Sequence, residues 1–195
     1  MTGAGASAPG HDDAAPPVPH LRPLAEVDAP AVLDAFRSDP GMSRQGRVTA
    51  PDEAEAYVRR VGDPGSGCAW AVCVGAELAG LVGITADRPN RNGWFWYWMT
   101  AGARGQGWTS RAAATVADWA LSAGGFERLE LGHRVNNPAS GAVARAAGFV
   151  KEGKQRGKFL IDGTRVDVDT YGRLATDPWP RYVPFAIAGE DAPTA

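Results

Sequence analysis

The residues with the clearest chemical potential lie at two junctions where a strand-like segment passes into a helix-like one. The first junction is residues 104–107, Arg-Gly-Gln-Gly, which follow the aromatic run 93–100 and precede a helical pattern that starts at Trp108. Backbone N–H groups at a helix start have no intrahelical partner, and the helix dipole adds partial positive charge there. Glycine has no Cβ to keep an anion away from these groups. The junction is therefore consistent with a phosphate-binding loop, although a plain connecting turn would have the same spacing.

Two common phosphate-binding patterns do not match this first junction. No Gly-Lys-Ser or Gly-Lys-Thr follows residues 104–107, which excludes a P-loop. The glycine spacing also lacks the third glycine and the later acidic residue of a dinucleotide-binding fold. A phosphate ligand at this junction would have to be held in another way.

The second junction is the segment 134–149, RVNNPASGAVARAAGF. Asn137 before Pro138 is typical of a helix N-cap followed by proline at the first helical position, and Gly148 is typical of a helix end. Ser140 comes three residues after the cap. Capping alone would explain both Asn137 and Ser140, so this junction does not by itself predict a functional site.

The elements that must position these junctions follow from hydrophobic periodicity and turn residues. Helices are expected at 28–37, at 49–62 with Thr49 as N-cap, from 108 to about 125, and at 138–148. Strands are expected at 19–24, at two segments within 67–86, and at 93–100, 126–135, 149–161 and 164–174. Strands alternate with helices only in the second half of the chain. The order therefore predicts an α/β (α+β) fold whose mixed sheet of about seven strands is flanked by about four helices, with parallel pairing where the long helix crosses over.

The aromatic strand carries three tryptophans at a spacing of two. Trp94, Trp96 and Trp98 should share one face of the strand, and residues 95, 97 and 99 the other. Packing beneath helices and an aromatic substrate pocket are both consistent with this stripe.

Composition excludes several functional classes. The chain of 195 residues carries a net charge of −2 with a pI near 5.9, so no global field attracts nucleic acid or an anionic membrane. Cys68 and Cys73 should point to opposite faces of a strand, which predicts thiols and not a disulfide, and no metal-ligand cluster surrounds them. The N-terminus lacks the basic start and apolar core of a signal peptide, and no apolar run is long enough to span a membrane. We expect a cytoplasmic protein.

The domain organisation is expected to be simple. Residues 1–18 contain little to bury and should form a disordered leader. Residues 19–175 should form a single domain. The segment 176–195 contains Trp179, Tyr182 and Phe185 and should pack partly on the domain before becoming disordered near Gly189.

Taken together, the two junctions resemble the GNAT superfamily of acyl-CoA-dependent N-acetyltransferases. The run ARGQGWTSRA is similar to the superfamily's phosphate-binding motif, and NNPASGAVARAAGFVKEG is similar to the RimJ/RimL branch, which acetylates ribosomal-protein N-termini. The resemblance extends from Leu21 to Leu174. It implies a GNAT fold whose splayed sheet forms a cleft for CoA, with the strand 94–101 diverging from its neighbour after His133.

The resemblance also implies site residues. The N–H groups of residues 105–110 would hold the CoA pyrophosphate, Asn137 would contact the pantetheine arm, and Ser140 would lie near the thioester sulfur as an acid or hydrogen-bond donor. The full set implied for acetyl-CoA is Met99, Arg104, Gly105, Gln106, Gly107, Trp108, Thr109, Ser110, Asn137 and Ser140. The catalytic candidates are Glu130, His133 and Ser140.

This chain departs from the pattern of the GNAT superfamily at several positions. Thr109 stands where the motif prefers glycine or alanine. Trp94 and Trp96 stand in the places of a common glutamate and glycine, and Lys158 falls about where some relatives carry another acid. The acid that many relatives carry on the aromatic strand is therefore absent.

The sequence offers two candidates for the base that accepts the amine proton. Glu130 lies in a Leu-Glu-Leu setting similar to the one that supplies the base in a sister N-terminal acetyltransferase, and a solvated carboxylate is the alternative. His133 is the second candidate because histidine titrates near neutral pH, with a structural histidine as the alternative. Glu152 belongs to a recurrent Glu-Gly turn and is expected to shape the strand. A protein α-amine has a pKa of about 7.7–8.0 against about 10.4 for lysine, so a missing acid favours an α-amine acceptor.

The expected function is transfer of an acetyl group from acetyl-CoA to a primary amine, by direct attack in a ternary complex. A protein N-terminus is the first acceptor to consider. A small amine such as an antibiotic or polyamine is the alternative, and a non-catalytic acyl-CoA sensor is an alternative of another class. No metal, nucleic acid or membrane is expected, and a homodimer is compatible with the sequence.

Overall fold

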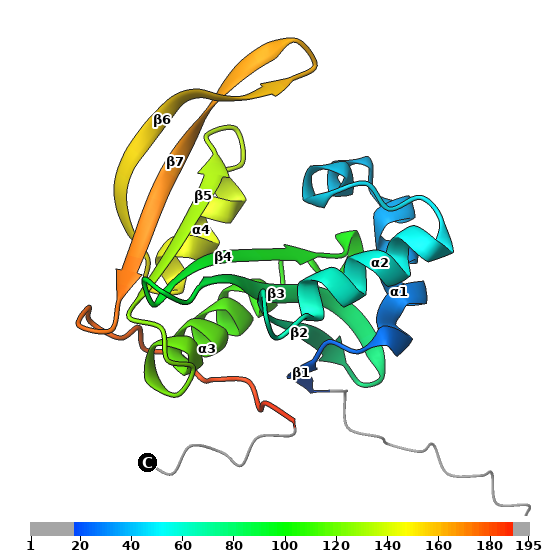
Figure 1. Cartoon of the computed structure of the whole chain (residues 1–195), viewed down its shortest axis with the longest axis horizontal. Helices are drawn as coiled ribbons and strands as arrows, with labels where there is room; N and C mark the ends of the chain where they lie inside the picture. The colour runs from blue at the N-terminus through cyan, green and yellow to red at the C-terminus, as the bar shows by residue number, and fades with distance from the viewer. Residues whose placement is uncertain (1–17, 189–195) are drawn as a thin grey trace, which may run out of the picture.

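The computed structural model describes residues 18–188, which form one twisted sheet with helices on both faces (Figure 1). The expectations for the leader before Val18 and for the segment from Gly189 onward lie outside these residues. The helices are α1 (Ala29–Ser38), α2 (Pro51–Gly62), α3 (Trp108–Ser122) and α4 (Pro138–Ala146), with short 3-10 turns η1 (Glu26–Asp28), η2 (Pro40–Gln45) and η3 (Ala101–Ala103). The strands are β1 (Pro19–Pro23), β2 (Gly67–Val74), β3 (Glu77–Asp87), β4 (Asn92–Met99), β5 (Arg128–Arg134), β6 (Val150–Ile161) and β7 (Thr164–Leu174).

The seven strands lie in the order β1-β2-β3-β4-β5-β7-β6. Every neighbouring pair is antiparallel except β4 and β5, which are parallel. A parallel pair needs a crossover, and α3 supplies it between these two strands. The predicted mixed sheet is confirmed, including its parallel pair at the long helix.

Two hydrophobic clusters cover the opposite faces of the sheet. One contains Phe95, Met99 and Leu129 with the alanines of α3, and the other contains Trp98 with residues of α1 and α2. The predicted alternation along β4 is therefore confirmed, because successive side chains enter opposite clusters. No disulfide joins Cys68 and Cys73, and these two side chains also pack in opposite clusters.

The helix starts differ in detail from those predicted. Thr49 is not the N-cap of α2, because the helix begins at Pro51 and Ala50 occupies the cap. The amide and the hydroxyl of Thr49 instead donate to Oε2 of Glu53, each at 2.7 Å. Asn137 is confirmed as the cap of α4, with its side-chain oxygen accepting from the amide of Ser140 at 3.3 Å.

The parallel strands β4 and β5 separate after three paired positions. Asn92, Gly93 and Trp94 pair with Arg128, Leu129 and Glu130, and no further pair joins the two strands. Divergence was expected only after His133, so that prediction was wrong by three residues. The reason is that β5 stays paired with β7 over its whole length while β4 stays paired with β3. Figure 1 shows β5 rising away from β4 together with β6 and β7.

The segment after β7 returns along α3 to the first strand. The hydroxyl of Tyr182 donates to Asp118 at 2.7 Å, and the amide of Phe185, whose side chain is buried, donates to the hydroxyl of Thr115 at 3.1 Å. The amide of Leu21 donates to the carbonyl oxygen of Ala186 at 2.8 Å. This segment therefore closes the α3 side of the fold, away from the opening between β4 and β5.

Candidate active site

The glycine junction forms a bare corner at the start of α3. Gly105 and Gly107 have φ values of +79° and +74°, in the left-handed region that favours glycine. A Cβ added to either residue would meet nothing within 4 Å, so open space lies beside both. Gly107 is the N-cap of α3 and provides no side-chain hydrogen bond to its first turn. The first amides of α3, from Trp108 to Ser110, are thus available to an anion.

Arg104 does not extend over this corner. Its Nε donates to the carbonyl oxygen of Met99 at 3.1 Å, and its terminal nitrogen lies 2.5 Å from Oδ2 of Asp39. The other oxygen of Asp39 accepts from the amide of Gly41 at 2.7 Å. The Gly41 amide, followed by the Arg104 guanidinium, holds the pKa of Asp39 below its usual value. Arg104 therefore links the corner to Asp39, the N-cap residue of η2.

The opening between β4 and β5 is bridged by Tyr97 and the first turn of α4. The Tyr97 hydroxyl donates to the carbonyl oxygen of Ser140 at 2.7 Å and lies 3.1 Å from the Ser140 hydroxyl. Because a carbonyl only accepts, the Ser140 hydroxyl is left to donate to the Tyr97 oxygen. Burial raises the pKa of Tyr97 to about 12, so the phenol stays protonated at neutral pH.

Sequence reasoning missed Tyr97 as a site residue. Its place on the strand face opposite the tryptophans was evident, but its partner Ser140 lies 43 residues away. Only the packing of α4 beside β4 brings the two hydroxyls together.

Glu130 lies at the last paired position of β5, opposite Trp94. Its Oε1 accepts from Nε of Arg128 at 2.7 Å. The two terminal nitrogens of Arg128 donate to Glu152 at 2.9 and 2.5 Å. Arg128 thus forms hydrogen bonds with both carboxylates, and the cluster of one arginine and two glutamates has a net charge of −1. The second carboxylate oxygen of Glu130, Oε2, has no hydrogen bond to any of the residues 18–188.

His133 lies on the other face of β5 from Glu130, because the two positions differ by three. The imidazole is 8% exposed and packs against α4, where a Cβ on Gly141 would come within 2.6 Å of Nε2. Its Nδ1 is 2.9 Å from the carbonyl oxygen of Arg134, and Nε2 is 3.3 Å from the Tyr171 hydroxyl. The structure therefore does not bring the two base candidates together, and both ring nitrogens of His133 have structural partners.

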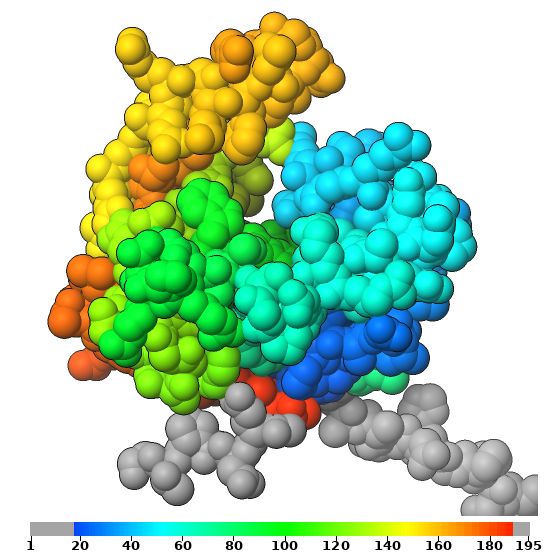
Figure 2. All heavy atoms as spheres, viewed as in Figure 1, coloured from blue at the N-terminus to red at the C-terminus, as the bar shows by residue number. Residues whose placement is uncertain are grey.

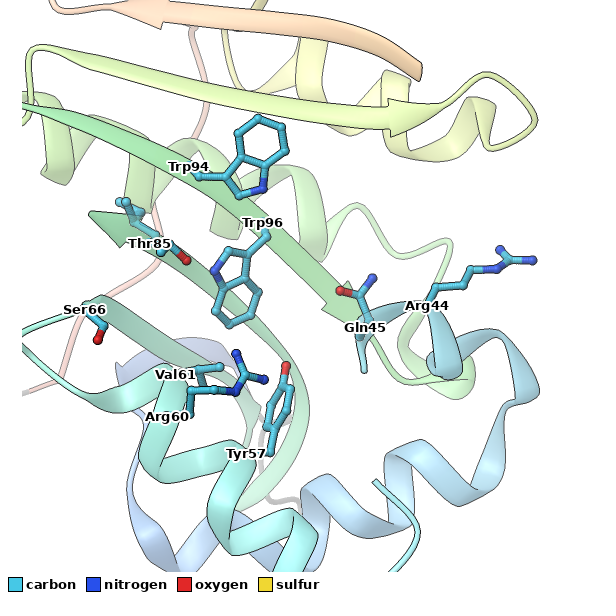
Figure 3. Close-up of a pocket in the computed structure, with 10 residues that line it drawn as sticks. Arg44, Gln45, Tyr57, Arg60, Val61, Ser66, Thr85, Trp94 and Trp96 are labelled. Atoms are coloured by element: carbon cyan, nitrogen blue, oxygen red, sulfur yellow. The ribbon is translucent and has the colours of Figure 1, made fainter. Parts of the chain in front are cut away.

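A cavity of about 450 Å³ opens on the face of the sheet that α1 and α2 cover. Trp94 and Trp96 form one wall, and Tyr57 and Arg60 of α2 form another (Figure 3). The remaining lining residues are Arg44, Gln45, Val61, Ser66, Ile84 and Thr85. Two of the three stripe tryptophans therefore line a cavity, while Trp98 packs in the core and donates to the Tyr57 hydroxyl at 3.1 Å.

A second cavity of about 330 Å³ adjoins the first and shares Arg44 with it. Its walls are η2, the end of β5 at Arg134, and the tip of the β6–β7 hairpin from Phe159 to Asp162. Figure 2 shows the molecule hollowed between this hairpin and the segment that joins α1 to α2. Lys158 stands on the exposed β6 and lines neither cavity.

The predicted acetyl-CoA residues thus fall into two groups. Gly105 to Ser110 form the corner and the start of α3, while Met99, Asn137 and Ser140 lie at the opening between β4 and β5. Thr109 is half-buried in the first turn of α3, and Gln106 is exposed. The corner and the opening lie at opposite ends of the short connection from Met99 to Gly107, so one extended ligand could contact both.

Within residues 18–188, no group of three or more histidine, cysteine, aspartate or glutamate side chains is arranged to hold a metal ion. None of the helices in that range has the length and apolar character needed to cross a bilayer.

Comparison with known proteins adds evidence of another kind. A protein-family model described as an acetyltransferase (GNAT) domain matches residues 20–150. The ribosomal-protein-serine acetyltransferase of Escherichia coli strain K12 is 29% identical over 99 residues, which span 50% of this chain and 55% of that protein. The chain therefore matches only about half the length of this relative.

Solved structures show the same likeness in three dimensions. RimL, a ribosomal L7/L12 alpha-N-protein acetyltransferase in complex with coenzyme A, gives a TM-score of 0.74 at 25% identity, over 80% of this chain and 93% of that one. The ribosomal-protein-S5-alanine acetyltransferase from Vibrio fischeri gives a TM-score of 0.73 at 20% identity, over 84% and 96% of the two chains. The second likeness concerns the fold alone.

Proposed function

The chain belongs to the acetyltransferase (GNAT) family, and from this premise we propose that it transfers an acetyl group from acetyl-CoA to the α-amine of a protein N-terminus. The observation that carries the proposal is the bare corner at Gly105 and Gly107 beside a sheet that opens after Trp94 and Glu130. Acetyl-CoA supplies the activated thioester, and RimL, which resembles this chain over most of its length, binds coenzyme A.

The residues of the corner and the opening fit such a ligand. The amides from Gly105 to Ser110 would bind the pyrophosphate, because the helix start leaves them unpaired and no Cβ blocks the approach. Beyond Trp94 the free edge of β4 offers backbone groups to a pantetheine amide chain. The side-chain oxygen of Asn137 already accepts the Ser140 amide and so caps α4. Its contact with the pantetheine arm would therefore use the hydrogen-bonding capacity that its side-chain amide has left.

The Ser140 hydroxyl would stabilise charge on the departing sulfur. It lies in the opening, half-buried, with Tyr97 as its neighbour. A rotation about the Cβ–Oγ bond would turn its proton from the Tyr97 oxygen toward the opening. Tyr97 would remain bonded to the Ser140 carbonyl and keep the first turn of α4 in place.

The acceptor amine must lose a proton before or during attack on the thioester. We assign this task to Glu130, whose Oε2 has no hydrogen-bond partner among the described residues 18–188 and which shares a sheet face with the cavity tryptophans. An α-amine with a pKa of about 7.7–8.0 demands less of the base than a lysine does. The arginines around the two cavities also disfavour a positive charge on the bound amine.

The alternative acceptors differ in how well they match the cavities. A polyamine would need carboxylates, yet among the described lining residues Asp162 is the sole acid. A small amine with an aromatic group, such as an antibiotic, would fit between Trp94 and Trp96. A sensor that only binds acyl-CoA would show no turnover with any amine.

The test is release of CoA thiol from acetyl-CoA with a panel of amines. The panel contains peptides with free Ser, Ala or Thr termini, the same peptides with blocked termini and an internal lysine, and spermidine. Release with the free termini alone is the expected result. Thiol release with lysine or spermidine alone would overturn the proposal. No thiol release with any amine, together with a rise in melting temperature on addition of acetyl-CoA, would favour the sensor.

A further inference from the structure

Three arginines around the two cavities form no salt bridge within residues 18–188. Arg60 lines the first cavity, Arg134 the second, and Arg44 lines both. None of the three makes a hydrogen bond or salt bridge with any residue from 18 to 188, although Arg60 lies 5.1 Å from the Tyr57 ring centroid. In Figure 3, Arg60 rises from α2 beside Tyr57, and Arg44 extends from η2 away from the two indoles.

Pairing is common elsewhere on this protein. Seven other arginines form a salt bridge with aspartate or glutamate: Arg22, Arg47, Arg59, Arg91, Arg104, Arg128 and Arg173. The cavity arginines therefore differ from many of their kind in the same chain. Guanidinium groups that line a cavity without a salt bridge are suited to bind an anion, since the planar group can donate two hydrogen bonds to one carboxylate.

The second cavity brings two of these arginines close together. Burial, followed by the charge of Arg44, lowers the pKa of Arg134. Arg134 is half-buried at the end of β5, and Arg44 faces it from η2. Asp162 at the hairpin turn is the acid on this wall and leaves a net positive charge. Two like charges held near each other are unfavourable unless a negative group joins them.

The surroundings of the two arginines indicate the kind of ligand. Phe159 and Leu160 line the same cavity and are 46% and 61% exposed. The cavity is open and adjoins the aromatic cavity at Arg44. An extended peptide could place its first residue between the indoles and its next residues between the hairpin and η2.

We propose that the acceptor is a protein N-terminus with acidic residues at its second to fourth positions, and that Arg44 and Arg134 bind these carboxylates. The proposal rests on the proposed function, because it specifies the substrate of the same site. Arg60 adds positive potential to the first cavity. Basic N-termini are disfavoured by the same charges.

The experiment compares three peptides that share an N-terminal serine and differ at residues 2 to 4, which are acidic, amide-containing or lysine. In the wild-type protein, kcat/KM should be roughly tenfold or more higher for the acidic peptide than for the amide peptide, and lowest for the lysine peptide. Arg44→Glu and Arg134→Glu should each abolish or reverse this order. Arg47→Glu is the matched control. Arg47 lies with Arg44 in the segment between α1 and α2, its side chain is 84% exposed, and it lines neither cavity.

A binding measurement separates failure of the inference from failure of the proposed function. The same peptides are titrated calorimetrically into wild-type and Arg44→Glu protein saturated with CoA. Selective binding of the acidic peptide that is lost in Arg44→Glu supports the inference even when no peptide is acetylated. Equal binding of all three peptides, no binding of the acidic one, or a preference for lysine would overturn it.

Discussion

The hydroxyls of Tyr97 and Ser140 lie 3.1 Å apart and join strand β4 to the first turn of α4 across the opening of the sheet. The second bond of Tyr97, to the Ser140 carbonyl at 2.7 Å, fixes which way the two protons point. Ser140 is therefore positioned by a residue on the strand that borders the proposed pantetheine path. A proton donor held in this way should affect turnover more than binding.

Replacing Ser140 tests that role. Ser140→Ala should lower kcat by about a hundredfold and leave KM for acetyl-CoA within about threefold, because the hydroxyl acts on charge that develops during reaction. Tyr97→Phe keeps the ring and loses both hydrogen bonds, so kcat should fall less and the free energy of unfolding by about 1 kcal/mol. Steady-state kinetics and urea unfolding measure the two effects. Equal kcat in wild type and Ser140→Ala would remove Ser140 from the mechanism.

The glycine corner can be tested with a matched neighbour. Gly107→Ala adds a Cβ at φ +74°, which strains the backbone where the amides of α3 begin, so KM for acetyl-CoA should rise roughly tenfold. Gly102 also has open space around it but does not adopt a positive φ, so Gly102→Ala should leave KM unchanged. Initial rates at varied acetyl-CoA provide the comparison. Identical KM values for the two variants would show that the corner does not hold the ligand.

Asp39 connects the corner with the segment that carries Arg44. One carboxylate oxygen accepts from the Gly41 amide at the start of η2, and the other bonds Arg104. Asp39→Ala should therefore raise KM for acetyl-CoA and for the acceptor together, each by about fivefold. Asp34→Ala, on the exposed side of α1, is the control. A rise in only one of the two KM values would contradict the idea that Asp39 holds both the corner and the segment of Arg44 in place.

The order of elements and the side-chain alternation of β4 were predictable from the sequence because they depend on local periodicity. The N-cap of α4 was predictable for the same reason, since Asn137 and Pro138 act within one turn. The cap of α2 was not, because Pro51 fixed the first helical residue and moved Thr49 one position outside. Thr49 and Ala50 were both possible caps by position, and Pro51 determined which of them became the cap.

The candidate site was predictable only where its geometry depends on neighbouring residues in the sequence. The corner at Gly105 and Gly107 depends on adjacent residues and was found. The separation of β4 from β5 depends on how long β5 stays paired with β7, which periodicity does not report. The charge of the cavities depends on Arg44, Arg60 and Arg134, which are distant in sequence and lie among many other arginines.

Asp28 offers a test of stability against pH. Its carboxylate is buried, which alone would raise its pKa, but hydrogen bonds from Arg22 and the Ala25 amide hold the pKa below its usual value. A lowered pKa contributes stability above the unfolded value, and that contribution is lost as pH falls through the folded value. Asp28→Asn should cost about 2 kcal/mol at pH 7, and the gap to wild type should narrow as the pH is lowered from 7 through the usual carboxyl value of about 4. Urea unfolding across that range measures the gap, and a gap that stays constant would rule out this pair as the cause.

Glu130 and Glu152 provide the sharpest comparison for the base, because both bond to Arg128. Only Glu130 lies opposite Trp94 at the point where the sheet opens, with one carboxylate oxygen left over. Glu130→Gln should lower kcat by about a hundredfold at pH 7, while Glu152→Gln should stay within about threefold of wild type. The defect of Glu130→Gln should shrink toward pH 9, because an α-amine with a pKa near 8 then reaches the site already neutral and needs no base. Rates from pH 6 to 9 with a free serine terminus measure this, and equal defects in the two variants would reduce Glu130 to a structural partner of Arg128.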